Sequence, residues 1–248
     1  IDQGLVGKTV KEIQKTNPEV LNNIEDFTLP VTLLRCDYLR TDHIEYIFTI
    51  FRRLNTGGLK LTNQEIRNAI FSGPFNDLLK KCNDMKAWKE LIRKTTGQKN
   101  KDDRFRSIEI VLKFFAFYDR LSGFKKGLSG YLNDYMKDSR FLQNDSLEKK
   151  EELFVKTINF ALTNLYARKP TNKLNGATFE AVLHGIAKNI ESLENLAAKS
   201  KQATVIRQYR NLLRQESFST EALSEGLYKK QKVIERFSLS ESYFAKRL

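Results

Sequence analysis

A turn with two adjacent glycines, within residues 51–71, holds the side chains in this sequence that are best placed to bind an anion. Guanidinium and ammonium groups beside flexible backbone and a helix N-terminus suit a phosphate, because the helix dipole is positive at that end. The residues of this turn to which we assign nucleotide or phosphate binding are Arg52, Arg53, Asn55, Gly57, Gly58 and Lys60.

The same turn is also typical of an ordinary junction between two helices. Gly57 and Gly58 reach the left-handed conformation that ends a helix. Thr62 and Glu65 then have the T-x-x-E spacing of a capping box, in which each side chain accepts from a backbone N–H at the next helix start. Since basic residues are common at helix ends, both interpretations of the turn stay open.

The charge of the chain favours an anionic partner. Among its 248 residues, 43 Lys and Arg stand against 30 Asp and Glu, which gives a formal net charge of +13. Residues 80–106 hold ten basic and four acidic residues, a concentration that suits contact with nucleic acid as well as a solvated surface. The residues that we assign to nucleic-acid binding are Lys94, Lys99, Lys101, Arg104 and Arg106.

Metal-dependent chemistry and a disulfide scaffold are not indicated. Cys36 and Cys82 have no framework spacing, and His43 and His184 are the only two histidines, so we predict no metal site. The sequence contains no run of about 18 apolar residues and no apolar segment typical of a secretory signal at its start. We therefore expect a cytoplasmic protein that does not contact a membrane.

No catalytic residue can be assigned from the sequence. Hydrolysis would need a nucleophile with a positioned base, or carboxylates and histidines gathered on a metal, and no such pattern appears. His184 lies in an apolar helical pattern, where a packing role is favoured. Glu109 and Glu180 also lie in apolar helical patterns, where a carboxylate could be buried and its pKa shifted.

Apolar residues recur at helical spacing along most of the chain, which predicts a mainly α fold. The segment 105–121 is apolar around most of its circumference and should be buried at the centre of a bundle, with its aromatic side chains in the core. The other helical segments that we predict are 9–24 with a break before Pro18, 42–54, 62–72, 75–82, 85–93, 128–136, 147–166, 179–196, 204–213 and 221–237.

One segment has the composition of a β-strand. Residues 26–36 carry apolar and β-branched side chains at strand length, with Pro30 typical of an edge or a bulge. A lone strand cannot form a sheet, so we expect its partner in sequence upstream of the chain, in another chain, or in a short strand without a clear pattern.

Several motifs in order resemble those of the GmrSD restriction endonuclease N-terminal domain family, also called domain of unknown function 262. IFRRLNTGGLKLTNQEIRNAIFSGPFNDLL at 50–79 is similar to that family's F-x-R-x-N-T-G, L-x-x-x-E-[LI]-R-N and F-N-x-L-L motifs. DRFRSIEIVLKFFAFYDRL at 103–121, GYLNDYM at 130–136 and LNGATFEAVLHGIA at 174–187 resemble its later helical regions. The resemblance spans nearly the whole chain.

The resemblance implies a fold and a domain division. It predicts that residues 1–72 are the C-terminal part of a ParB-like and sulfiredoxin-like α/β core, with its remaining strand near 27–36, and that residues 73–248 form a multi-helix domain. The family's upstream D-G-Q-Q-R signature is absent. Together with the first residue, Ile1, this indicates a piece of a longer protein whose catalytic segment lies upstream.

The resemblance also implies a function. Such proteins are prokaryotic and serve restriction or anti-phage defence, and some hydrolyse nucleotides or cut DNA. We expect this chain to contribute nucleotide or nucleic-acid phosphate binding and to be inactive alone. A nuclease partner, and a nucleoside triphosphate with Mg²⁺ in the full-length protein, are consistent with the family. The alternative is a helical module that binds nucleic acid or docks a partner without catalysis.

The family pattern assigns roles to residues of the glycine turn. Phe51, Arg53 and Asn55 match F-x-R-x-N, and Gly57 matches the glycine that follows. Phe51 should anchor the core, and Arg53 and Asn55 should contact a nucleotide or phosphate, with helix capping as the alternative role of Asn55. Arg52 occupies a variable position in that pattern.

Overall fold

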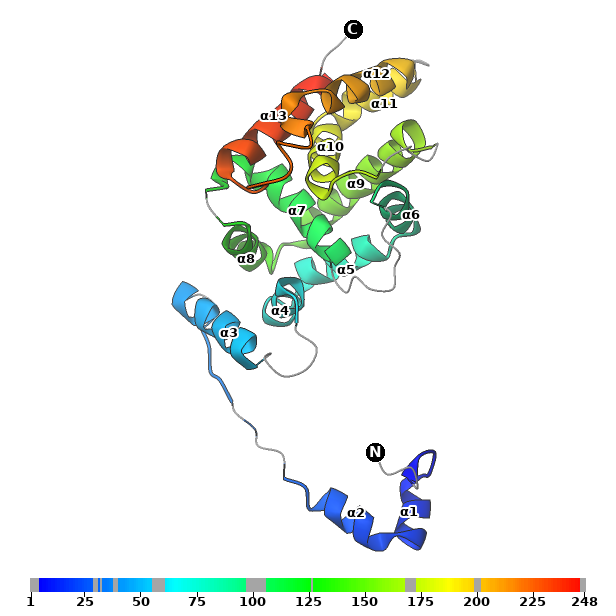
Figure 1. Cartoon of the computed structure of the whole chain (residues 1–248), viewed down its shortest axis with the longest axis vertical. Helices are drawn as coiled ribbons and strands as arrows, with labels where there is room; N and C mark the ends of the chain where they lie inside the picture. The colour runs from blue at the N-terminus through cyan, green and yellow to red at the C-terminus, as the bar shows by residue number, and fades with distance from the viewer. Residues whose placement is uncertain are drawn as a thin grey trace. The chain divides into compact units, whose positions relative to one another are not determined.

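The computed structural model describes residues 5–28, 31, 33–37, 40–54, 61–96, 106–125, 127–167, 173–198 and 202–245, except for the side chains of residues 41, 52 and 54. Within these ranges it contains thirteen α-helices and no β-strand (Figure 1), which confirms the predicted mainly α class. The helices are α1 (Val10–Thr16), α2 (Pro18–Glu25), α3 (Thr41–Leu54), α4 (Asn63–Ile70), α5 (Pro74–Asp84), α6 (Lys86–Thr95), α7 (Arg106–Arg120), α8 (Leu128–Ser139), α9 (Asn144–Phe160), α10 (Gly176–Lys188), α11 (Ile190–Ala198), α12 (Gln202–Leu213) and α13 (Lys230–Ala245).

The chain divides into two compact units, Ile1–Ile47 and Phe48–Leu248. In the first, α1 and α2 pack against each other. Pro18 occupies the first turn of α2, where its missing N–H costs nothing, and this confirms the predicted break. The division that we predicted after residue 72 stays a prediction.

The strand predicted at residues 26–36 is wrong for the described part of that segment. Residues 26–28, 31 and 33–36 form neither a strand nor a helix. Val31 is 78% exposed and Leu33 is 89% exposed. The β-propensity of the sequence is real, but a strand requires a ladder partner, and the described residues supply none.

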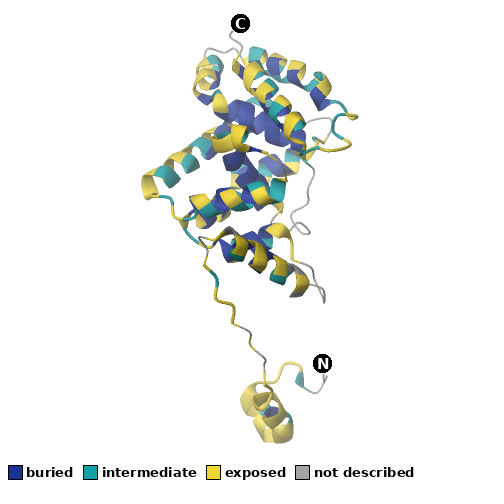
Figure 2. Cartoon of the chain, turned by 90° about the vertical axis from the view of Figure 1, so that its left-hand side faces the viewer, coloured by how far each residue is buried: buried dark blue, intermediate teal, exposed yellow. Residues whose placement is uncertain are grey.

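The core of the second unit surrounds α7. Its residues Ile110 to Phe117 are all buried, and α5, α8 and α10 pack around it. The Phe115 ring contacts the ring of Phe75 on α5 and that of Phe154 on α9, with centroid distances of 6.0 and 5.8 Å. Figure 2 shows the buried residues gathered in the interior of the helical body. The prediction that these aromatic residues form the core is therefore confirmed.

The last predicted helix begins nine residues later than expected. The pattern predicted residues 221–237, whereas α13 starts at Lys230 and continues to Ala245. Gly226 has a φ of 60°, in the left-handed region, so an α-helix cannot pass through it. The ammonium of Lys232 donates to the carbonyl oxygens of Ala222 and Glu225 at 3.1 and 2.9 Å, which holds the preceding turns against α13.

Helices α10 and α13 approach each other closely at Gly185. Every residue of α10 from Ala177 to Ala187 is buried, and α13 packs along it. A Cβ atom built on Gly185 would lie 2.3 Å from Ser240 Oγ and 2.7 Å from the Ser240 carbonyl carbon. Only glycine therefore permits this helix–helix distance.

Replacing Gly185 with alanine is expected to destabilise the protein by about 1–3 kcal/mol, because α13 must move to relieve a contact with its backbone. Urea unfolding followed by circular dichroism measures the change. Gly130 in α8 is the matched control, since a Cβ there meets no atom within 4 Å. Gly130→Ala should stabilise by up to about 1 kcal/mol through helix propensity. Equal effects of the two changes would contradict the tight contact.

Candidate functional site

The predicted phosphate-binding turn is only partly described by the structure. Arg53 lies in the last turn of α3 and is exposed. The side chain of Arg52 and the whole of Asn55, Gly57, Gly58 and Lys60 lie outside the described residues. The phosphate-binding role of these six residues stays a prediction.

The start of α4, just after this turn, is already occupied by a carboxylate. Glu65 Oε2 accepts from the Thr62 N–H at 2.6 Å, and Thr62 Oγ1 accepts from the Glu65 N–H at 3.2 Å. This is the predicted capping box, which is confirmed. An anion that bound at the start of α4 would have to compete with the negative charge of Glu65.

The lysines of the predicted basic stretch are mostly engaged within the fold. The ammonium of Lys94 is 3.0 Å from Glu90 Oε1 and donates to the carbonyl oxygen of Tyr166 at 3.3 Å. Lys94 therefore ties α6 to the end of α9. Arg106 is exposed at the start of α7 and makes an interaction of its own. Lys99, Lys101 and Arg104 lie outside the described residues. Further ion pairs of the stretch are Lys80–Asp77, Lys81–Glu151 and Lys89–Asp84.

A backbone hydrogen bond joins the end of α6 to the residues that precede α10. The N–H of Leu174 donates to the carbonyl oxygen of Thr95 at 2.8 Å. This bond joins the residues that enter the segment 97–105 to those that leave the segment 168–172. Both segments are rich in basic residues. This bond therefore adjoins, in sequence, the start of the first segment and the end of the second.

A stripe of three arginines on α12 was not recognised in the sequence. Arg207 and Arg210 lie one turn apart on α12, and Arg214 directly follows its last residue, Leu213, at the C-terminal end of the helix. All three are exposed and make no ion pair with a described residue. The chain has no acidic residue between Leu196 and Gln215. This combination of helical spacing and absent acids is the signal that could have identified the stripe.

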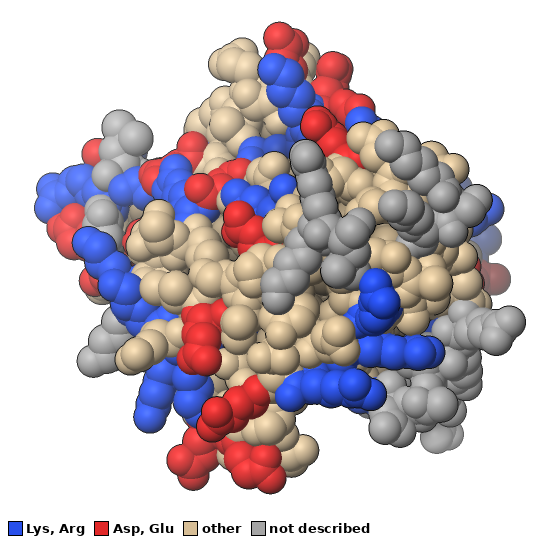
Figure 3. Space-filling model, turned by 90° about the horizontal axis from the view of Figure 1, so that it is seen from above, with Lys and Arg blue, Asp and Glu red and all other residues tan. Residues whose placement is uncertain are grey.

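Charges of both signs cover other parts of the surface. Figure 3 shows the molecule from the end at which α11, α12 and α13 lie in Figure 1, and several Lys and Arg side chains lie side by side there, next to groups of Asp and Glu. A single uniformly basic face is not visible from this side. Any anion site on this face must therefore be local.

A chain of buried charges runs through the interior of the second unit. Lys113 on α7 donates to Glu180 Oε1 on α10 at 3.1 Å and to the Tyr228 hydroxyl at 3.0 Å. Lys113 is also 3.2 Å from Glu109 Oε1, and Glu109 Oε2 accepts from Arg67 Nη1 on α4 at 3.0 Å. The sequence-based expectation that Glu109 and Glu180 are placed in the interior holds for Glu180, whereas Glu109 is half-buried.

The ionisation of this chain is set by competition between burial and charge. Burial alone would lower the pKa of Lys113, but the negative charges of Glu180 and Glu109 and the Tyr228 hydroxyl raise it above the ordinary lysine value. Burial alone would raise the pKa of Glu109, but Lys113 and Arg67 lower it. Lys113 and Glu109 are therefore both charged at neutral pH and stabilise each other.

Arg67 has few donors left for a ligand. Its side chain is only 1% exposed, and its three nitrogens all donate hydrogen bonds. The acceptors besides Glu109 are Asn133 Oδ1 at 2.9 Å, Gln64 Oε1 at 3.0 Å and the Ser129 hydroxyl at 3.2 Å. The arrangement joins α4 to α7 and α8, so we assign it a structural role.

A serine, a histidine and a glutamate meet between α10 and α13 without the geometry of a hydrolytic triad. His184 Nε2 lies 3.6 Å from Glu241 Oε2, and neither ring nitrogen has a hydrogen-bond partner among the described residues. The hydroxyl of Ser240 is fully buried and also lacks a partner. A nucleophile must be hydrogen-bonded to its base and open to substrate, and Ser240 is neither. The His184 ring instead packs against Phe237, with a centroid distance of 5.0 Å.

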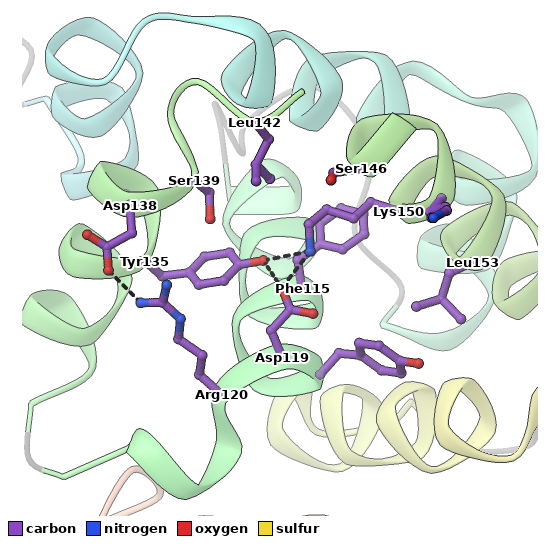
Figure 4. Close-up of a pocket in the computed structure, with 12 residues that line it drawn as sticks. Phe115, Asp119, Arg120, Tyr135, Asp138, Ser139, Leu142, Ser146, Lys150 and Leu153 are labelled. Carbon is purple, nitrogen blue, oxygen red and sulfur yellow. Dashed lines mark hydrogen bonds and ion pairs between the residues drawn. The ribbon is translucent and has the colours of Figure 1, made fainter. Parts of the chain in front are cut away.

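A groove of about 480 Å³ lies between α7, α8 and α9. At its centre the Tyr135 hydroxyl and the Lys150 ammonium both donate to Asp119 Oδ2, each at 2.5 Å (Figure 4). Across the Tyr135 ring, Arg120 Nη1 pairs with Asp138 Oδ2 at 2.6 Å. Burial and the Asp119 carboxylate raise the pKa of Tyr135, so its hydroxyl stays protonated and donates.

Comparisons with protein families, with curated proteins and with solved structures give no match for this chain. Within the described ranges, no helix is long and apolar enough to cross a membrane. Among the same residues, no group of three or more His, Cys, Asp or Glu side chains is arranged to hold a metal ion. The functional argument therefore depends on the geometry of the chain itself.

Proposed function

We propose that this chain is a helical module that binds the phosphate backbone of nucleic acid within a restriction-type, anti-phage defence protein. The observation that carries the binding function is the α12 stripe of Arg207, Arg210 and Arg214, which is exposed and free of ion pairs with described residues. Arginine binds phosphate through paired N–H groups, and a helical row of arginines follows a charged backbone without reading its sequence.

Two further features support this proposal. The formal charge of +13 raises the local concentration of a polyanion around the whole molecule. Basic residues also occur in the sequence segments 97–105 and 168–172, which adjoin the hydrogen bond between Leu174 and Thr95. The defence context comes from the resemblance of residues 50–79 and later motifs to the GmrSD N-terminal domain family.

Neutralising the stripe is expected to weaken binding to duplex DNA by roughly tenfold or more at moderate salt. In the Arg207→Gln, Arg210→Gln, Arg214→Gln variant, each lost phosphate contact should reduce the slope of log affinity against log salt by about 0.9. Fluorescence anisotropy with a labelled duplex of random sequence, repeated at several salt concentrations, measures both quantities.

The matched control replaces three exposed lysines elsewhere, Lys11, Lys15 and Lys125, with glutamine. This variant loses the same net charge as the stripe variant. If the stripe makes the phosphate contacts, the control should keep most of the slope of log affinity against log salt. If the two variants weaken binding equally, the attraction is general and the α12 stripe is not the site. If the unaltered chain does not bind at low salt, the proposed function is wrong.

Partner docking without catalysis is the second candidate function, and one observation favours it. Phe27, Val31 and Leu33 are large apolar residues that are 71%, 78% and 89% exposed. Several large exposed apolar side chains within a short stretch of sequence are typical of an interaction segment. Leu33→Asp should abolish self-association measured by light scattering if a second copy of the chain is the partner, and should leave DNA affinity unchanged.

A further inference from the structure

The groove between α7, α8 and α9 combines a polar centre with an apolar wall. Figure 4 shows the side chains of Tyr135, Asp119 and Lys150 converging at its centre, with Leu153 to one side and Leu142 and Ser146 near one another. Phe115, which is fully buried, forms part of its lining. A volume of about 480 Å³ is in the range of pockets that hold small molecules.

The charges of the groove leave a positive excess. Arg120 is neutralised by Asp138, and Lys150 is neutralised by Asp119. Lys149 also lines the groove, is exposed, and makes no ion pair with a described residue. The Ser146 hydroxyl, one turn before Lys149 and Lys150 on α9, adds a donor on the same wall. This wall therefore favours a negatively charged group.

The apolar part of the lining favours a ligand that also carries an apolar group. Leu142 and Leu153 are both partly exposed and line the groove. An inorganic anion would leave these surfaces in contact with water, whereas a planar ring would cover them and gain about 25 cal/mol for each Å² removed from water. A ligand that satisfies both walls must carry a ring and a negative group together.

We propose that this groove binds a small organic anion with a planar aromatic ring, held by Lys149 at its negative group and by Leu142 and Leu153 at its ring. The negative group of such a compound is a phosphate ester or a carboxylate. This site is separate from the arginine stripe on α12, so it stands or falls independently of the proposed nucleic-acid function.

Calorimetric titration with phenyl phosphate and with benzoate tests the proposal and distinguishes the two kinds of negative group. At least one of them should bind saturably with one site per chain, and roughly tenfold tighter than inorganic phosphate or phenol, each of which lacks one half of the ligand. If neither compound binds saturably at 10 mM, or if inorganic phosphate binds as tightly, the proposal is overturned.

Two variants locate the binding in the groove. Lys149→Gln should weaken binding of the aromatic anion at least fivefold without changing the melting temperature, because Lys149 is exposed and unpaired with described residues. Leu142→Trp should fill the groove and block binding without changing any charge. The matched control, Lys86→Gln on α6, removes an exposed lysine elsewhere and should bind normally.

The arginine-stripe variant should also bind the aromatic anion with unchanged affinity, because α12 does not line the groove. Unchanged binding by Lys149→Gln, or equal losses in Lys149→Gln and Lys86→Gln, would show that the anion is held elsewhere and would overturn the assignment.

Discussion

Replacing Lys113 with methionine is expected to lower the free energy of unfolding by about 3–5 kcal/mol at pH 7. The Lys113 side chain is 9% exposed, and it stands between Glu180, whose side chain is 5% exposed, and the half-buried Glu109. Methionine keeps the length and apolar stem of lysine but removes the ammonium. Glu180 is then left buried without its closest cation, which is the costly result of breaking a buried pair.

The matched control is Lys156→Met on α9. Lys156 pairs with Glu152 at 2.7 Å, but both side chains are exposed to solvent, so the loss should be much smaller than at Lys113. The double variant Lys113→Met, Glu180→Gln should recover part of the loss, because no buried charge is left unpaired. Chemical unfolding of the four proteins measures these differences. Equal losses at Lys113 and Lys156 would mean that Glu180 is stabilised by another cation, such as the buried Arg236 on α13, whose charge also interacts with it.

The helices of this chain could be predicted because each depends on local spacing. The buried face of α3 appears in the sequence as Ile44, Ile47 and Phe48, and all three are buried. The start of α4 was predictable from Thr62 and Glu65, since a capping box is contained within four residues. Local patterns of this kind need no knowledge of the tertiary structure.

The pairing of the buried charges could not be predicted in the same way. Arg67 and Glu109 are 42 residues apart in sequence, and Lys113 and Glu180 are 67 apart. Helical spacing indicates that each lies on an apolar element, but not which residue of another helix it faces. The strand prediction failed for a related reason, because residues 26–36 have β-propensity but the described residues provide no partner strand.

The candidate sites differ in how far the sequence could identify them. The arginine stripe needs only the spacing of Arg207, Arg210 and Arg214 and the absence of nearby acidic residues, both of which the sequence contains. The groove needs α7 and α9 to lie side by side, so that Asp119 meets Lys150 from 31 residues away. The charge of the sequence alone led us to assign Lys94 to nucleic-acid binding, but in the structure its ammonium donates to a backbone carbonyl oxygen of the protein itself.

Acid is expected to destabilise the protein through His184. Burial, with a smaller effect of Lys188, lowers the pKa of His184 to about 3 in the folded state, from an ordinary value of 6.5. The unfolded chain therefore binds a proton that the folded chain does not over the range from about pH 6.5 to pH 3. The stabilisation is fully present above pH 6.5 and is lost as the pH falls through this range.

On the order of 3 kcal/mol of unfolding free energy should disappear through this residue between pH 7 and pH 4, because each unit of pH below the unfolded pKa costs about 1.4 kcal/mol. His184→Leu cannot take up a proton, so its stability should fall less steeply with acid than that of the unaltered protein. Urea unfolding at intervals between pH 7 and pH 4 measures both slopes. Glu241→Gln should leave this slope nearly unchanged, because the folded state already binds almost no proton at His184 above about pH 4, whether or not the carboxylate 3.6 Å from Nε2 is present. If the slopes of His184→Leu and the unaltered protein coincide, the histidine is protonated in the folded state and the interior between α10 and α13 is more polar than its contacts indicate.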